Sequence, residues 1–210
     1  MIRIYTSRTD ELKDENRFNE SYMQAAGYRK KKTDRLKGME DKMRSLAAED
    51  LLRKACKECN VVYDGRVETD ANGKPRIMGA AGIDHNISHS GNRVLLVMAD
   101  HEVGCDVEAV GRCSLKIARR FFGGEELEGI EQLSGEERDI YLTKLWVLKE
   151  SFIKAVGKGL AYPIDKAVFK IDDNKVVLCD APGVAADDYR FRLWEEEGYC
   201  YAVAEHIGNA

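Results

Sequence analysis

A long helical pattern followed by alternating strands occurs twice along this chain, and this repeated order constrains the fold more than any other feature. In the first instance, residues 41–59 place apolar side chains at intervals of three and four, which indicates a helix with one buried face. In the second, residues 135–156 form a longer helical pattern that ends at Gly157 and Gly159. The sequence therefore predicts an α+β fold built from two similar halves.

Segments in which apolar and polar residues alternate precede and follow both helices. A short strand is predicted at residues 2–7, and a polar helical stretch at residues 10–26 separates it from a basic run at residues 29–37. One antiparallel sheet is expected from residues 61–68, 83–88, 94–99 and 103–107. Two more helices are predicted at residues 114–122 and 125–133, and four more strands at residues 167–171, 175–179, 189–194 and 199–205.

The two halves are expected to pack rigidly, because no stretch rich in Pro, Gly or Ser separates them. The boundary is predicted near residues 100–104, with an N-terminal half at residues 1–101 and a C-terminal half at residues 102–210. A junction of two packed halves is a natural place for a ligand site. Two halves already form a complete unit, so we expect a monomer.

Composition excludes several classes of protein. The chain has 210 residues, of which 44% are apolar, and this is enough for a buried core. Its net charge of −4 argues against nucleic-acid binding, which needs an excess of Lys and Arg. No apolar run approaches the ~20 residues that span a bilayer, and residues 1–6 lack the long apolar segment of a secretion signal. We therefore expect a cytoplasmic protein that binds neither nucleic acid nor membranes.

Two carboxylates, Asp106 and Glu108, lie two residues apart on a predicted strand and therefore project from the same face. A hard divalent cation would relieve their repulsion, and Mg²⁺ prefers one or two carboxylates together with waters and phosphate oxygens. The alternative is a pair of solvated acids at a strand end. Spacing alone favours this alternative, since the chain has 37 acidic residues.

A stripe on the long C-terminal helix adds a third carboxylate. Trp146, Glu150 and Lys154 recur every four residues and therefore share one face, with Lys149 beside them. Glu150 and Lys154 could form no more than a surface ion pair, but the tryptophan on the same line indicates that the stripe faces protein.

Ser88 and His89 follow an alternating strand and precede a turn glycine, which would present a hydroxyl and an imidazole at the rim of a sheet. Such groups can hold phosphate oxygens. A Ser-His-Asp triad is the competing interpretation, but the chain has no G-x-S-x-G elbow, and adjacent strand residues point to opposite faces. The basic run, Arg44 and Lys74 offer cations to a polyanionic ligand.

Four segments taken together resemble the Sfp-type phosphopantetheinyl transferases in order and spacing; they are residues 73–75, 86–91, 104–108 and 146–160. The last of them, W-x-x-K-E-S-F-x-K-A-x-G-K-G-L, is far too specific for chance. The resemblance implies a pseudo-dimer of two α+β halves with the active site at their interface. It also implies Mg²⁺-dependent transfer of 4'-phosphopantetheine from the substrate coenzyme A to a serine of an apo acyl or peptidyl carrier protein, as in holo-acyl-carrier-protein synthases.

The resemblance also implies roles for individual residues. Asp106, Glu108 and Glu150 match the Mg²⁺ ligands, with Mn²⁺ as an alternative ion, and Lys154 matches a catalytic cation that contacts the pyrophosphate. Glu126, or alternatively Glu150, is implied as the base that takes the serine proton. Further contacts to coenzyme A are implied for Arg29, Lys32, Arg44, Lys74, Ser88, His89 and Lys149.

The implied partner is a carrier protein with an acidic recognition helix, which we expect to dock near residues 114–122, where Arg119 and Arg120 lie. A function of another class is a non-catalytic module of the same fold that binds coenzyme A or a carrier protein. Acids at all three metal positions argue against it. A third candidate is a Mg²⁺-dependent phosphodiesterase or nuclease, which the net charge of −4 disfavours.

Overall fold

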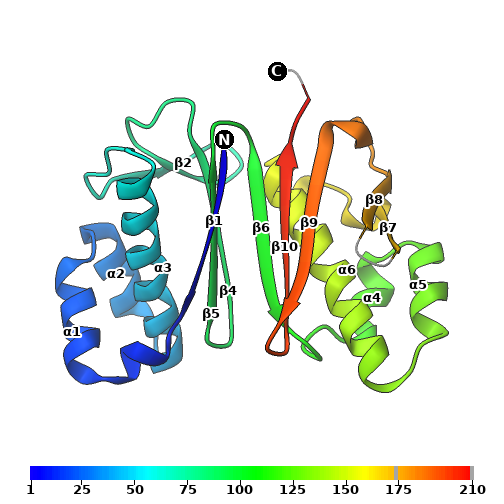
Figure 1. Cartoon of the computed structure of the whole chain (residues 1–210), viewed down its shortest axis with the longest axis horizontal. Coiled ribbons are helices and arrows are strands. Elements are labelled where there is room, and N and C mark those ends of the chain that lie inside the picture. Colours follow the sequence, from blue (N-terminus) through cyan, green and yellow to red (C-terminus); the bar gives the residue numbers. More distant parts are fainter. Residues whose placement is uncertain (173–174, 209–210) are drawn as a thin grey trace. The chain divides into compact units, whose positions relative to one another are not determined.

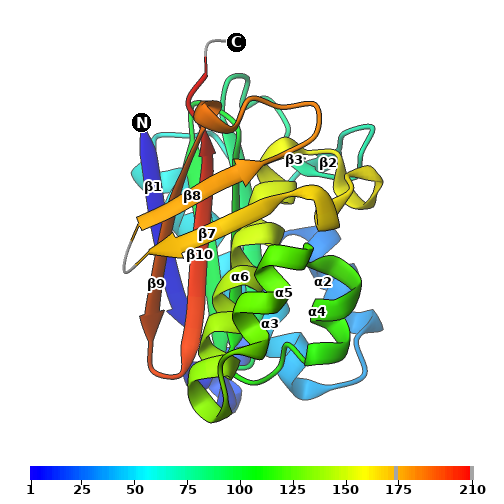
Figure 2. The same ribbon diagram turned by 90° about the vertical axis from the view of Figure 1, so that its right-hand side faces the viewer.

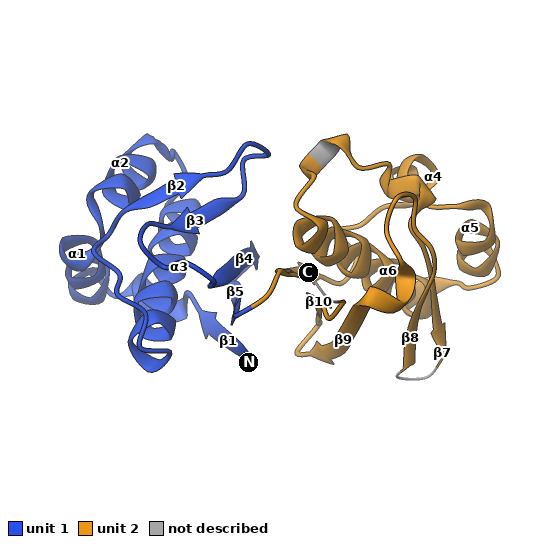
Figure 3. Cartoon of the chain, turned by 90° about the horizontal axis from the view of Figure 1, so that it is seen from above, with its two compact units in different colours: residues 1–100 blue, residues 101–210 orange. Residues whose placement is uncertain are grey.

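The structure is a computed structural model that describes residues 1–172 and 175–208. The chain divides into two compact units, Met1–Asp100 and His101–Ala210, which Figure 3 colours separately. Each unit combines a three-stranded antiparallel sheet with helices, which confirms the predicted α+β fold class.

In unit 1 a long helix packs on the sheet, and two shorter helices pack on that helix (Figure 1). The sheet consists, in spatial order, of β1 (Ile2–Arg8), β5 (Arg93–Ala99) and β4 (Asp84–Ser90). The helices are the 3-10 turn η1 (Asp10–Lys13), α1 (Glu15–Gln24), α2 (Gly27–Arg35) and α3 (Met39–Glu58). A separate short hairpin joins β2 (Val67–Thr69) to β3 (Pro75–Ile77).

The core of unit 1 forms where the apolar stripe of α3 meets the central strand. Leu46 and Ala55 of α3 have no exposed surface, and Leu52 has 1%. Every residue of β5, the central strand of this sheet, is buried. Each buried leucine contributes roughly 2 kcal/mol to stability, so the stripe predicted from residues 41–59 holds this unit together.

Unit 2 repeats this order of elements. The first strand of the unit, β6 (Val103–Ala109), pairs with its last strand. The penultimate strand pairs with the other edge of that last strand, as in unit 1. The last two strands are β9 (Tyr189–Glu196) and β10 (Tyr199–His206). Between β6 and β9 the chain forms the helices α4 (Leu115–Phe121), α5 (Gly124–Glu131) and α6 (Gly135–Val156), which lie together in Figure 2. A second hairpin joins β7 (Val168–Asp172) to β8 (Lys175–Asp180), and single 3-10 turns cover Gly159–Ala161, Ile164–Lys166 and Ala186–Asp188.

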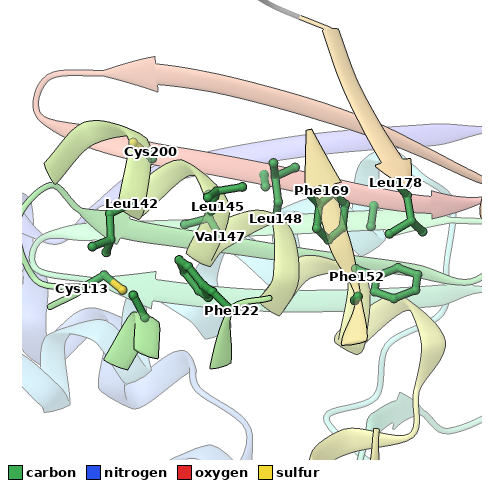
Figure 4. Packing of buried hydrophobic residues seen from close by; sticks show 14 of the residues in the cluster. Cys113, Phe122, Leu142, Leu145, Val147, Leu148, Phe152, Phe169, Leu178 and Cys200 are labelled. Atoms are coloured by element: carbon green, nitrogen blue, oxygen red, sulfur yellow. The ribbon is translucent and has the colours of Figure 1, made fainter. Parts of the chain in front are cut away.

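Helix α6 is the central element of the unit 2 core (Figure 4). Its residues Leu145, Leu148 and Phe152 have no exposed surface. Phe152 meets Phe169 of β7 edge to face, with ring centroids 6.0 Å apart. Gly157 ends the helix with a φ of 72°, a left-handed conformation that glycine adopts without a steric penalty.

Some predictions of strand pairing were wrong. Residues 61–107 do not form one sheet, because β2 and β3 form a separate two-stranded sheet and β6 pairs with β10 in unit 2. The predicted strand at residues 61–68 is reduced to β2, and most of the basic run lies in helix α2. Alternation of apolar and polar residues indicates a strand, but which strands pair depends on contacts between distant parts of the chain. None of the described helices is long and apolar enough to cross a bilayer.

Candidate functional site

An acidic cluster lies where β6 faces α6 in unit 2. Asp106 and Glu108 project from the same face of β6 as Gly104, where an added Cβ would meet the backbone of α6. Lys154 of α6 donates from Nζ to Oδ1 of Asp106 at 2.6 Å and to the carbonyl oxygen of Cys105 at 3.1 Å. The structure therefore brings Lys154 of the predicted helix stripe to Asp106, whereas Trp146 of the same stripe packs against Phe121 and Phe122.

The charges in this cluster influence one another. Burial raises the pKa of the Glu150 carboxyl, and the negative charges of Asp106 and Glu108 raise it further, against the effect of Lys154. At Lys154, burial would lower the pKa, but the carboxylate of Asp106 outweighs this and raises it. The lysine is therefore charged at neutral pH, and together with Arg112, whose Nε lies 3.6 Å from Oε1 of Glu108, it balances part of the negative charge of the carboxylates.

This donor set suits a hard divalent cation. Mg²⁺ prefers oxygen ligands, and three mutually repelling carboxylates provide them. Among residues 1–172 and 175–208, no three His, Cys, Asp or Glu side chains are already arranged as a metal-binding group. Oδ1 of Asp106 accepts from Lys154, and Oε1 of Glu108 accepts from the Ala109 amide at 3.0 Å. One or two carboxylates suffice for Mg²⁺ when phosphate and water supply the remaining ligands, so the residues fit this ion without a preformed cage.

Lys149 does not lie in this cluster, which argues against its predicted contact to coenzyme A. Its side chain has no exposed surface, and Nζ lies 2.8 Å from Oε2 of Glu126. Nζ also donates to the carbonyl oxygens of Ile164 and Ala167. An ammonium group has three N–H donors, and all three are used inside the protein. Lys149 is therefore a structural residue that connects α6 to α5 and to the segment before β7.

Glu126 is enclosed in the same way, which argues against its predicted role as the base. Its side chain is 1% exposed, and besides Lys149 it accepts the amide of Gly123 at 2.8 Å and that of Phe169 at 3.0 Å. A carboxylate with both oxygens engaged and no access to solvent cannot reach a serine of another protein. Glu150, the alternative base, is only half-buried.

Unit 1 contains a cavity of about 280 Å³ bounded by α2, α3, β4 and the hairpin of β2 and β3. Three of the predicted contacts to coenzyme A line it, namely Arg29, Lys32 and His89. The volume is slightly below the range that encloses a drug-sized ligand, so the cavity can hold part of such a molecule. Its apolar lining consists of Ala48, Leu52, Val67, Pro75 and Ile87.

The other predicted contacts of unit 1 do not line this cavity. Lys74 is buried and donates from Nζ to Oδ2 of Asp84 at 2.5 Å. Arg44 donates to the carbonyl oxygen of Gly91 at 2.8 Å. Ser88 projects from the face of β4 opposite to that of His89, because successive side chains of a strand point to opposite faces. Roles for Lys74, Arg44 and Ser88 in binding coenzyme A remain predictions.

The sequence-based prediction missed Glu49, a buried carboxylate beside the cavity. Its Oε2 accepts from the hydroxyl of Tyr28 at 3.0 Å and from Nε of Arg29 at 3.1 Å. Its Oε1 accepts from the hydroxyl of Tyr63 at 3.0 Å and from the Ala26 amide at 3.3 Å. These four hydrogen bonds hold Tyr28 and Arg29 on the cavity wall.

Two sequence signals could have found these buried charges. Glu49 lies three residues from both Leu46 and Leu52, within the apolar stripe of α3. Lys149 lies between Leu145 and Phe152 on the core stripe of α6. A charged residue on an apolar stripe is buried with the stripe and must find a partner there.

Comparison with known proteins identifies the family of this chain. Residues 102–204 match the 4'-phosphopantetheinyl transferase superfamily. The chain is 33% identical over 156 residues to the 4'-phosphopantetheinyl transferase ffp of Bacillus subtilis, a match that covers 73% of this chain and 70% of the relative. The chain belongs to the 4'-phosphopantetheinyl transferase superfamily, which confirms the resemblance of its four motifs.

Within the superfamily, the chain is similar to Sfp-type relatives. It is 34% identical over 140 residues to 4'-phosphopantetheinyl transferase Sfp of Bacillus subtilis strain 168, and 32% identical over 143 residues to psf-1 of Bacillus pumilus. Each match covers 67% of this chain, and the chain spans 62% of the length of Sfp and 61% of that of psf-1. Among solved structures, holo-[acyl-carrier-protein] synthase of Thermotoga maritima aligns at 25% identity with a TM-score of 0.43, over 51% of this chain and 64% of its own.

Proposed function

We propose that this protein transfers the 4'-phosphopantetheine group of coenzyme A to a serine of an apo acyl or peptidyl carrier protein and releases 3',5'-ADP. The observation that carries the proposal is the acidic cluster, in which Lys154 pairs with Asp106 beside Glu108 and Glu150. Such a cluster suits catalysis on a pyrophosphate, whose charge must be neutralised for one oxygen to leave. Membership of the superfamily supports the same function.

In this mechanism the chain positions groups and neutralises charge. Asp106, Glu108 and Glu150 would hold Mg²⁺ or, alternatively, Mn²⁺, and the bound ion supplies positive charge to the pyrophosphate oxygens. Lys154 would contact the same oxygens and stabilise the charge that develops on the departing 3',5'-ADP. The serine oxygen forms a bond to the β-phosphorus while the bond from that phosphorus to 3',5'-ADP breaks. Glu150 is the candidate acceptor for the serine proton, because Glu126 is enclosed.

The nucleotide end of coenzyme A is assigned to the cavity of unit 1. Arg29 and Lys32 provide positive charge for phosphate oxygens, and guanidinium groups form paired hydrogen bonds with such oxygens. His89 adds a polar group on the same lining. The apolar lining suits the flat base of the nucleotide.

The carrier protein is proposed to dock at α4. Arg119 is 67% exposed there, and the guanidinium of Arg120 lies over the ring of Phe121, 5.1 Å from its centroid. Exposed arginines beside an aromatic ring suit an acidic helix that also carries apolar residues. Reversal of both charges to Glu should weaken carrier binding without changing coenzyme A binding. Unchanged carrier affinity would exclude this surface.

The direct test mixes the protein with Mg²⁺, coenzyme A and a panel of apo carrier proteins, and measures the intact mass of each carrier. A mass gain of one phosphopantetheine group that EDTA abolishes establishes the function and identifies a partner. Size-exclusion chromatography with light scattering tests the expectation of a monomer, and cell fractionation tests the expectation of a cytoplasmic protein.

Two other functions are distinguished by the same samples. A non-catalytic module would bind coenzyme A while leaving every carrier unmodified. A phosphodiesterase would release 3',5'-ADP from coenzyme A alone, without any carrier. The acidic cluster favours transfer over the non-catalytic module, because pure binding does not need three carboxylates beside a phosphate.

A further inference from the structure

A buried histidine lines the cavity of unit 1 and has no role in the mechanism above. His85 of β4 is 3% exposed and shares one face of the strand with Ile87 and His89. Its ring nitrogen Nδ1 is buried, and none of the residues that the structure describes forms a hydrogen bond with it. Buried polar atoms nearly always have a partner, so this nitrogen indicates a ligand atom in the cavity.

The imidazole of His85 is neutral at pH 7. Burial is the largest cause that lowers its pKa to about 4, and the positive charges of Lys74, Arg76 and Arg29 lower it further, against the effect of Asp84. A neutral imidazole carries one N–H donor and one nitrogen acceptor. It therefore binds uncharged polar edges well, whereas phosphate oxygens are bound more strongly by the guanidinium and ammonium groups that line the same cavity.

We infer that His85 is a specificity-determining residue, which forms a hydrogen bond with the edge of the heterocyclic base when a nucleotide occupies this cavity. The inference rests on the proposed function, which assigns the nucleotide end of coenzyme A to this place. Adenine carries an amino donor at its 6-position, and Nδ1 of His85, as the acceptor nitrogen of the neutral imidazole, would accept a hydrogen bond from it. Leu52, Val67 and Pro75 provide an apolar lining for the faces of the ring.

The expected loss of binding affinity follows from the free-energy cost of leaving a polar group unpaired in a buried site. A site built to form a hydrogen bond rejects an analogue that lacks the matching group, because the polar atom of the site then stays unpaired. Loss of one such bond weakens binding by about tenfold.

The test measures binding by calorimetry with the full chain and two probes, 3',5'-ADP and its hypoxanthine counterpart, in which an oxygen replaces the 6-amino group. The unaltered protein should prefer the adenine probe about tenfold. His85→Phe keeps the ring volume but removes both nitrogens, so it should bind the two probes equally and the adenine probe about tenfold more weakly. His85→Gln, which keeps a donor and an acceptor, should retain part of the preference.

A third probe, 5'-AMP, separates the base from the phosphate. Removal of the 3'-phosphate should weaken binding by the same factor in the unaltered protein and in His85→Phe, because other residues hold that group. If His85→Phe loses the preference for the 3'-phosphate and not the preference for adenine, the histidine contacts phosphate and the inference is wrong. Equal binding of both bases by the unaltered protein, or no binding of any of these nucleotides, would also overturn it.

A measurement on the unaltered protein covers the case in which His85→Phe does not fold. The chain has four histidines, so their ¹⁵N ring signals can be assigned by substituting the other three one at a time. Addition of 3',5'-ADP should shift the His85 signals, and unchanged signals under saturation would contradict the inference. Failure of the proposed function looks different: the protein would still discriminate between the bases but would modify no carrier.

Discussion

Asp106 is the residue on which the proposed transfer depends most. Replacement by Ala removes one candidate metal ligand and leaves the charge of Lys154 without its closest partner. We expect Asp106→Ala to lower the rate of transfer about 100-fold or more while the protein stays folded. Single-turnover mass measurements on a carrier give the rate, and circular dichroism checks the fold.

Glu128→Ala is the matched control, because Glu128 is an exposed acid of unit 2 outside the cluster. Its transfer rate should stay within about twofold of the unaltered protein, as expected for a surface substitution. A folded Asp106→Ala with near-normal transfer would show that the metal assignment is wrong.

Glu49 is a positioning residue, since it acts through Arg29 and Tyr28 and does not line the cavity. Glu49→Gln presents an amide N–H₂ to groups that are themselves donors, so the network cannot remain intact. We expect the KM for coenzyme A to rise about tenfold, with kcat within about twofold. The neighbouring Asp50→Asn should leave KM unchanged, because Asp50 bonds to Ser21 and not to this network. Equal effects of both substitutions would refute the positioning role.

The neutral state of His85 gives the stability of the fold a dependence on pH. Its folded pKa, about 4, lies below the ordinary value of 6.5, so between these values the unfolded chain binds a proton that the folded chain does not. The free energy of unfolding should therefore fall as the pH drops from about 6.5 to about 4, by roughly 2 kcal/mol between pH 7 and pH 5. Urea titrations at the two pH values measure this loss, and His85→Gln should lack this part of it. An equal loss in both proteins would contradict a neutral His85.

At the scale of elements, the contact between β6 and α6 determines where the acidic cluster forms. A Cβ on Gly104 would lie 2.1 Å from the carbonyl oxygen of Ser151, which is backbone and cannot move aside alone. We expect Gly104→Ala to lower the free energy of unfolding by about 3 kcal/mol or more, because the strand must separate from the helix. Chemical denaturation measures this change.

Gly124→Ala is the control for Gly104→Ala, since Gly124 begins α5 and a Cβ there meets nothing within 4 Å. Ala favours the helix over Gly, so this substitution should leave stability unchanged or raise it by up to about 1 kcal/mol. If both substitutions have the same effect, close packing at Gly104 is not the cause.

At the scale of the whole molecule, the residues that the structure describes include one hydrophobic core in each unit. Leu52→Ala creates a cavity in the core of unit 1, and Leu148→Ala creates one in the core of unit 2. We expect each substitution to increase amide hydrogen exchange mainly in its own unit, as measured by mass spectrometry of peptides. A uniform increase over the whole chain in both variants would show that the units unfold as one.

The sequence by itself determined the features that depend on local periodicity. It predicted α6 with its observed ends, because apolar spacing and a terminal glycine both act within a few residues. It placed Asp106 and Glu108 on one face, since alternation along a strand is a property of the backbone. The motif from Trp146 onward identified the family, and the two halves followed from the repeated order of elements.

Only the tertiary structure decided which groups are enclosed and which strands pair. Lys149 and Glu150 are adjacent in the sequence, yet one is sealed in an ion pair with Glu126 and the other lies in the acidic cluster. β6 follows the sheet of unit 1 in the chain but pairs with β10. The hydrogen-bond partner of Glu49, Arg29, and the enclosure of His85 depend on segments that are distant in the sequence. The physical reason is the same in each case: burial and pairing depend on distant contacts, which local sequence patterns do not specify.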